Sequence, residues 1–306
     1  MLKYTIKRLV QLVIMLLVLT VVEFSIVRFI PGDPPATMLG ASATHAQIEA
    51  ERERLGLNEP LPVQYKKFMT ELAKGDLGTS IQTRKPVSYE LGRRFPNTIR
   101  LAVGATAVAS VFGIVLGIIS AVRHNKFSDN AIMVVSLVSV SMPSFFFALL
   151  MMLLFSVKLR WLPTIGLETW KHHIMPILTL SLPTIGYIAR TTRSSMLDVI
   201  NQDYIRTSRS RGIPTRVIIF SHAFKNALIP VLTAIGMYFG GLLAGATISE
   251  TVFSINGIGS FLVSSVLQRD YPAIQGSILV LATVFAVVNT VVDLLYGLVD
   301  PRIKYD

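Results

Sequence analysis

The chain has 306 residues, of which 52% are hydrophobic and only 15% are charged. A soluble protein carries about a quarter charged residues, so this composition excludes an ordinary globular domain and indicates a polytopic membrane protein. The chain has no cysteine, which excludes disulfides and thiolate chemistry. The net charge of +11 could indicate a nucleic-acid partner or a membrane topology, and its distribution decides between the two.

Six apolar segments are candidates to cross a bilayer, which takes about 20 helical residues. The fourth is short and contains Pro176 and Pro183, so its limits are the least defined. The first follows basic residues, as a secretory signal would, but its length and the lack of a small-residue cleavage site favour an uncleaved helix. We therefore expect an all-α polytopic membrane protein with six transmembrane helices. The segments are residues 9–30, 98–122, 131–157, 174–189, 228–248 and 274–299.

The basic residues gather in alternate connections. The N-terminus, residues 123–130, residues 190–227 and the C-terminal tail together hold +9 of the net charge, whereas the connections on the opposite side hold +2. The positive-inside rule then places both termini in the cytoplasm. The basic excess is explained by topology, and no nucleic-acid partner is expected.

Three regions follow from this topology. Residues 1–30 form an N-terminal transmembrane helix, residues 31–97 an extracytoplasmic loop region, and residues 98–306 a transmembrane core with the cytoplasmic loop 190–227. In the external region, the sequence from Thr44 to Gln47 predicts a capping box that opens a helix, which Gly56 ends. A second helix is expected over 63–73, followed by a glycine turn. About 67 residues without disulfides form a cap rather than a separate enzyme domain.

Reactive side chains are scarce within the spans. All five histidines fall in loops or at span boundaries, and the adjacent pair His172 and His173 is more typical of a membrane interface than of a metal site. Glu23 and Asp293 could serve an ion-coupled carrier, but each lies nearer the end of a span than its centre. An interhelical hydrogen bond is the plainer interpretation of both carboxylates. We expect no catalytic residue, metal or cofactor.

Small residues and prolines indicate how the helices pack. Glycines four residues apart at 113 and 117, 236 and 240, and 241 and 245 would let helices approach closely. Pro143 should kink the third span, either as a static bend or as a hinge. The candidate pore-lining residues are Pro143, Thr233, Tyr238 and Thr247.

The most specific segment is the cytoplasmic stretch 198–230. An acidic first turn, a basic last turn and a Gly-Ile-Pro stop predict a short helix that is too polar for lipid. An interfacial amphipathic helix is one interpretation, and a docking helix is the other. Its residues are Asp203, Tyr204, Ile205, Arg206, Thr207, Ser208, Arg209, Ser210, Arg211 and Gly212.

This stretch resembles the coupling loop of permease subunits of binding-protein-dependent ABC importers, in the dipeptide and oligopeptide branch that also includes glutathione and nickel permeases. That branch often carries Arg-Thr-Ala, where this chain has Arg206, Thr207 and Ser208. The resemblance covers the whole chain. Further matching stretches are residues 55–62, 75–78, 189–196, 269–276 and 292–303.

The resemblance implies a multi-pass permease of the bacterial cytoplasmic (inner) membrane that forms half of a translocation pore. Its implied partners are a homologous sister permease, two ABC ATPase subunits and an extracytoplasmic substrate-binding protein, with a dipeptide or oligopeptide as substrate. Residues 203–212 would seat in an ATPase groove, with Tyr204 and Ile205 as apolar anchors. Residues 31–97 and 255–270 would meet the binding protein, although packing of the latter against the permease is the more ordinary explanation.

The chain itself is not expected to hydrolyse ATP. No Gly is followed by Lys, so the P-loop sequence is absent and partner subunits would bind ATP. Two alternatives stay open: an ion-coupled carrier that depends on Asp293, and a membrane scaffold with an interfacial basic helix. Within the family, the sequence does not define the solute or the peptide length.

Overall fold

The computed structural model describes residues 2–29, 33–40 and 43–299, and within this part of the chain it is helical throughout, with one isolated bridge between Thr79 and Pro86. The expected all-α class is confirmed. The helices are α1 (Leu2–Phe29), α2 (Pro34–Leu39), α3 (His45–Arg54), α4 (Leu61–Ala73), α5 (Val87–Val122), α6 (Phe127–Ser141), α7 (Ser144–Met151), the π-helical η1 (Met152–Lys158), α8 (Trp170–Ile200), α9 (Asp203–Ser210), α10 (Thr215–Val217), the π-helical η2 (Ile218–Phe224), α11 (Lys225–Val252), α12 (Ile258–Leu267) and α13 (Tyr271–Val299).

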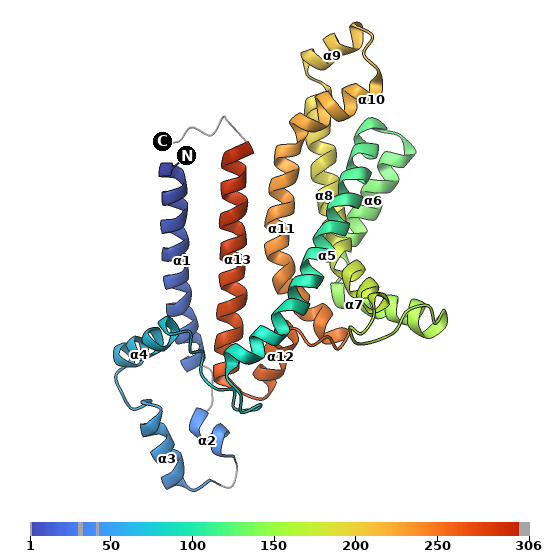
Figure 1. The fold of residues 1–306 in the computed structure, drawn as a ribbon. Helices are drawn as coiled ribbons and strands as arrows, with labels where there is room; N and C mark the ends of the chain where they lie inside the picture. Colours follow the sequence, from blue (N-terminus) through green and yellow to red (C-terminus); the bar gives the residue numbers. More distant parts are fainter. Residues whose placement is uncertain (1, 30–32, 41–42, 300–306) are drawn as a thin grey trace.

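The long helices α1, α5, α8, α11 and α13 run side by side (Figure 1). At one end α9 and α10 project beyond the bundle, and at the other end α2, α3, α4 and α12 gather. The start of α1 and the end of α13 lie at the same end as α9, as the expected topology requires. The cytoplasmic assignment of that end stays a prediction, and the residues after 299 lie outside the described part.

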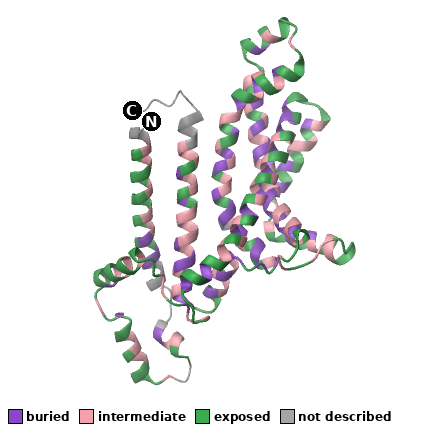
Figure 2. Ribbon diagram, in the orientation of Figure 1, coloured by how far each residue is buried: buried purple, intermediate pink, exposed green. Residues whose placement is uncertain are grey.

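The number of apolar spans is smaller than expected. Four helical stretches are long and apolar enough to cross a membrane, namely Thr5–Ser25, Val87–Val122, Thr215–Leu243 and Tyr271–Leu294, and α6 with α7 and η1 makes a fifth if the bent pair is one span. The expected fourth span, residues 174–189, lies inside α8, which does not qualify among the described helices. Its polarity has a physical reason: the helix packs against α5, α6 and α11, which bury its hydroxyl groups away from lipid (Figure 2).

The third expected span is broken rather than kinked. α6 ends at Ser141 and α7 begins at Ser144, and their axes differ by 104°. Met142 is extended, with φ −79° and ψ 126°, as the residue before a proline prefers. Pro143 lacks an N–H and cannot continue the helix, so the chain turns here. The expected bend is confirmed, and residues 131–157 form a sharply bent pair of helices rather than one continuous helix.

Close packing at α5 is confirmed. A Cβ added at Gly117 would lie 2.5 Å from the Cβ of Thr192 on α8, and one at Gly113 would lie 2.7 Å from Ile188. On α11, Gly236 and Gly240 meet α13 in the same way. The remaining expected pair differs, because Gly241 has no neighbour within 4 Å among the described residues and Gly245 only touches Leu180.

The external region is more helical than expected. Thr44 accepts a hydrogen bond from the backbone N–H of Gln47 at the start of α3, which confirms the capping box. Gly56, with φ +68°, follows the end of α3 as expected. α5, however, begins at Val87, so the helix starts before the expected first residue of the span at 98. The first turns of α5 lie at the same end of the molecule as α12 (Figure 1).

Replacing Gly117 with alanine tests the α5–α8 contact. The added methyl group would overlap Thr192, and overpacking of this kind costs about 1–3 kcal/mol. We expect Gly117→Ala to lower the midpoint of thermal unfolding in detergent, followed by circular dichroism. Gly92→Ala, on the same helix with no neighbour within 4 Å, is the matched control and should be neutral or slightly stabilising. Equal midpoints for the two variants would contradict the close contact.

Candidate functional sites at the two ends of the molecule

The predicted docking helix is present as α9. It begins at Asp203 and ends at Ser210, with Arg209 in its last turn. Gly212 has φ +74°, its N–H donates to the carbonyl of Arg209 at 3.0 Å, and the N–H of Ile213 donates to the carbonyl of Ser208 at 3.3 Å. This pair of bonds is a glycine-dependent helix stop, so the predicted end of the helix is confirmed.

The two apolar residues of α9 have different environments. Ile205 is fully buried in a cluster formed by α5, α8, η2 and α11, so it fixes α9 to its own chain. The expectation that Ile205 contacts an ATPase is therefore corrected. Tyr204 is 43% exposed, and its hydroxyl accepts a hydrogen bond from Asn226 at 3.0 Å. The cluster residues that surround Ile205 are Ile118, Ala121, Met196, Ile218, Ala223 and Ala227.

The rest of α9 faces outward at the tip of the molecule (Figure 1). α9 and the residue after it carry three arginines and one aspartate, and an ion pair within the helix joins Arg206 to Asp203 at 3.9 Å. An exposed basic face of this kind favours an acidic partner surface. The exposed residues are Asp203, Tyr204, Arg206, Thr207, Arg209, Ser210, Arg211 and Gly212, and Ser208 is partly exposed.

A buried ion pair beneath α9 was not foreseen. Arg193 of α8 binds Asp129 of α6 with two hydrogen bonds, from Nε at 2.7 Å and from Nη2 at 2.8 Å. Ser120 of α5 also donates to this fully buried carboxylate, as does the backbone N–H of Asn125 at 2.9 Å. The sequence suggested that residues 190–227 are a loop, but α8 runs to Ile200, and α9, α10 and η2 follow it. Arg193 is thus part of the core rather than a loop charge.

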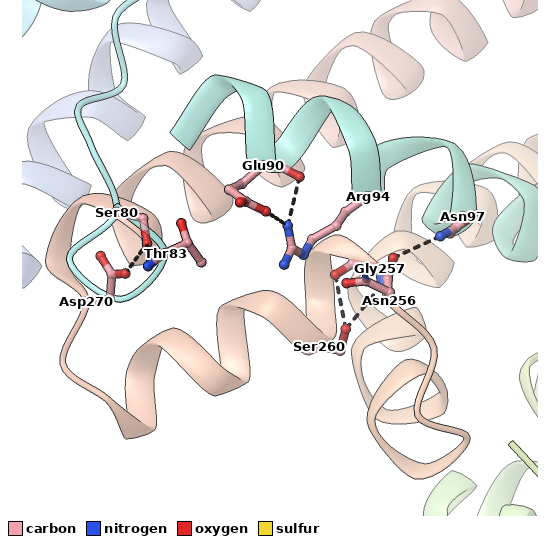
Figure 3. Close-up of polar contacts among 9 residues, drawn as sticks. All are labelled: Ser80, Thr83, Glu90, Arg94, Asn97, Asn256, Gly257, Ser260 and Asp270. Atoms are coloured by element: carbon pink, nitrogen blue, oxygen red, sulfur yellow. Dashed lines mark hydrogen bonds and ion pairs between the residues drawn. The ribbon is translucent and has the colours of Figure 1, made fainter. Parts of the chain in front are cut away.

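At the opposite end, a polar cavity of about 360 Å³ opens between α5, α12 and the turn before α12 (Figure 3). Most of its lining side chains carry hydroxyl, amide or charged groups. They are Gln82, Thr83, Arg94, Glu250, Thr251, Ser254, Ile255, Asn256, Ser260, Phe261 and Ser264.

Glu250 at the end of α11 organises the wall of this cavity. Its side chain is fully buried, and it accepts hydrogen bonds from the hydroxyl of Thr98 at 2.6 Å and from the backbone N–H of Ser260 at 2.9 Å. Thr98 in turn accepts from the N–H of Ile258 at 2.9 Å. Burial raises the pKa of the Glu250 carboxyl, and these hydrogen bonds act in the opposite direction. A side chain at Gly257 would overlap this carboxyl group, so the turn requires glycine.

Arg94 lies on the α5 side of the same cavity (Figure 3). Its Nη1 donates to the carboxylate and to the carbonyl oxygen of Glu90, one turn earlier on α5. Its guanidinium carbon lies 4.2 Å from the centroid of the Phe261 ring, a cation–π contact. No sequence signal marked Arg94 as functional, because it fell in the expected external loop and counted only toward the charge balance.

A second buried carboxylate, that of Asp270, lies at the same end of the molecule as the cavity. Asp270 accepts from the hydroxyl of Ser80 at 2.5 Å and from the N–H of Gln82 at 3.1 Å, which ties the loop before α5 to the start of α13. Ile258 and Phe261 of α12 are buried against the chain, so packing explains much of the apolar stripe in 255–270.

The candidate pore residues do not come together. Thr233 lines an apolar groove of about 430 Å³ between α11 and α13, whereas Tyr238 packs on Tyr187 of α8 with centroids 4.3 Å apart. Thr247 lies against α12, where a side chain at Gly259 would overlap it. Pro143 begins α7. A pore role for these residues stays a prediction.

The two carboxylates of the expected spans, Glu23 and Asp293, have different environments. Asp293 forms an ion pair with Arg8 of α1 at 3.0 Å, which is the interhelical contact expected as the plainer interpretation. Glu23 is buried, but its oxygens have no hydrogen-bond partner among the described residues. His172 bonds Thr169 at the start of α8, and no group of three metal-ligating side chains occurs in the described part of the chain.

Comparison with known proteins agrees with this architecture. Residues 113–305 match the family described as binding-protein-dependent transport system inner membrane component, and residues 1–102 match the N-terminal component of the same system. The glutathione transport system permease protein GsiC of Pectobacterium atrosepticum is 43% identical, and the dipeptide transport system permease protein DppB of Alkalihalophilus pseudofirmus is 44% identical. Each alignment covers all of both chains.

Solved structures share the fold at low identity. An inward-facing MetNI methionine ABC transporter chain has a TM-score of 0.57 and 18% identity, covering 69% of this chain and 97% of that one. A chain of an amino acid ABC transporter has a TM-score of 0.52 and 14% identity, covering 71% and 95%. The full-length relatives, the apolar helices and the shared fold lead to one conclusion: the chain belongs to the binding-protein-dependent inner-membrane transport components and is an ABC importer permease of the dipeptide and glutathione group.

Proposed function

We propose that this permease imports dipeptides or other short peptides as one half of a pore shared with a homologous sister permease, and that α9 docks on a cytoplasmic ABC ATPase. Relatives named for dipeptide and glutathione transport, at more than 40% identity, support a small peptide as substrate. An external binding protein would deliver it. ATP would be bound and hydrolysed by the partner subunits, since the sequence has no P-loop.

The observation that carries the docking proposal is the division of α9 into two faces. Its arginines are exposed at the tip of the molecule, and Ile205 on the other face is fully buried among α5, α8, η2 and α11. A partner that binds the basic face therefore pulls directly on the helices of the permease core. The Ile205 side chain connects the docking surface directly to these helices.

The same helices reach the external cavity. α5 contributes Arg94 and α11 contributes Glu250 to its lining, and Thr98 of α5 donates a hydrogen bond to Glu250. The cavity lies at the opposite end of these helices from α9 (Figure 1). The Asp129–Arg193 ion pair joins α6 to α8 on the α9 side. Movement of α9 that accompanies ATPase closure would thus be carried through α5 and α11 to the external face.

Isolation from native membranes in mild detergent tests the assembly. Mass spectrometry should identify a second homologous permease, ABC ATPase subunits and a substrate-binding protein with this chain. The assembled complex, reconstituted in proteoliposomes with its binding protein, should take up dialanine only when ATP is present on the ATPase side. Recovery of this chain alone, or uptake driven by an ion gradient without ATP, would contradict the proposal.

Charge reversal on α9 tests docking. Arg206→Glu places a carboxylate on the exposed basic face, and because like charges at an interface are costly, ATPase affinity should fall about tenfold or more. The measurement is co-purification of the ATPase with the tagged permease, with membrane abundance of the permease as a check. Lys74→Glu, an exposed change of the same charge at the external end, is the matched control and should leave ATPase recovery unchanged.

The helix stop after α9 allows a test of backbone shape alone. Gly212 has φ +74° and open space around the position of a Cβ, so a substitution acts through backbone strain rather than a clash. Gly212→Val should reduce ATP-driven uptake and ATPase recovery, because a β-branched residue avoids this conformation. Gly212→Asn, which tolerates positive φ, should keep most of both. Similar losses in both variants would show that the stop does not depend on this conformation.

A further inference from the structure

The guanidinium of Arg94 has two edges with different environments. Nη1 is occupied by Glu90, whereas Nε is buried and has no hydrogen-bond partner in the part of the chain that the structure describes. A buried N–H without an acceptor is unfavourable, and native structures rarely leave one without reason. The side chain keeps 15% of its exposed area and lines the external cavity, so a ligand in that cavity can reach the guanidinium, and a small shift of the side chain is needed to bring Nε into contact with it.

The unoccupied edge of Arg94 is formed by Nε and Nη2, and the same edge binds carboxylates in other arginines of this chain. Arg193 uses Nε and Nη2 to bind both oxygens of Asp129, and Arg54 uses the same two nitrogens on Glu51. Such parallel bonds match the spacing of the two carboxylate oxygens and are stronger than neutral hydrogen bonds. The Phe261 ring and Glu90 hold the Arg94 guanidinium from its face and from Nη1, which leaves the Nε and Nη2 edge for a third partner.

We propose that Arg94 binds the terminal carboxylate of a short peptide in the external cavity, before the peptide enters the pore. The inference rests on the proposed peptide substrate and adds the group by which the permease itself recognises it. A volume of about 360 Å³ lies within the range of small-molecule sites. Hydroxyl and amide groups around the cavity, from residues such as Thr251, Asn256 and Ser264, supply donors and acceptors for peptide N–H and C=O groups.

The other charges near the cavity permit an anionic ligand. Glu250, the acidic residue of the lining, has its oxygens engaged by Thr98 and Ser260, and its burial raises its pKa, which reduces its repulsion of a carboxylate. Glu90 neutralises part of the Arg94 charge, and its removal should therefore strengthen rather than weaken the binding of an anion.

The test measures dialanine binding to the assembled importer in detergent without the binding protein, by equilibrium dialysis with radiolabelled dipeptide. Dialanine amide, which lacks the carboxylate, should compete at least about tenfold more weakly than unlabelled dialanine. Arg94→Lys keeps a positive charge for Glu90 but loses the two-nitrogen edge, so dialanine binding should fall about tenfold or more. Glu90→Gln should keep binding or strengthen it.

A structural role for Arg94 predicts a different pattern. If the Glu90 ion pair only stabilises the fold, Arg94→Lys and Glu90→Gln should reduce binding together, and this result would overturn the proposal. Ser264→Asp is a second variant that leaves Arg94 intact and places a competing carboxylate in the cavity. Because loss of the Ser264 hydroxyl affects both ligands and the added carboxylate repels only dialanine, binding of dialanine should fall more than binding of the amide.

Two further results separate this inference from the proposed function. If the wild-type importer takes up dialanine but the permease complex does not bind it, or binds the amide equally well, Arg94 is not a carboxylate site. If Arg94→Lys changes only the affinity of the binding protein for the permease, the guanidinium meets that protein, and the proposal is again overturned. Absence of dialanine uptake by the complete wild-type system would instead reject the peptide substrate.

Discussion

The close approach of α5 and α8 is the contact on which the rest of the structure depends. Gly113 and Gly117 leave no side chain between the two backbones, so Ile188 and Thr192 lie directly against α5. In a membrane, packing of small residues replaces the hydrophobic drive that folds soluble helices. The α5–α8 pair contacts Asp129 and Ile205 at one end, and α5 bonds Glu250 at the other. Both candidate sites therefore pack against these helices.

Three buried carboxylates follow one rule, which Glu23 does not share. Asp129, Glu250 and Asp270 are fully buried, and each accepts at least two hydrogen bonds from other helices or loops. Burial of a charge is costly unless it is paired, so these residues specify which segments meet. Arg94 differs because one of its edges is satisfied and the other is not.

Local features were predictable from the sequence and long-range contacts were not. Asp203 and Gly212 define α9 through capping and backbone conformation, which depend only on neighbouring residues. Whether Ile205 faces a partner or its own chain depends on α5, α8 and α11, and the sequence analysis assigned it to the partner. The bond between Thr98 and Glu250 joins residues 152 positions apart, a pairing that no spacing along one helix reveals. The short polar fourth span was hard to delimit because α8 is covered by other helices rather than by lipid.

The burial of Ile205 also limits how the docking helix can move. A helix held only at its two ends could rotate about its own axis when an ATPase moves against it, without displacing the rest of the chain. α9 is short and pinned near its middle, so swivelling would expose an isoleucine side chain to water. Translation of α9 together with the core should therefore cost less free energy than its rotation. The burial of Ile205 therefore couples any displacement of α9 to the helices α5, α8 and α11 of the core.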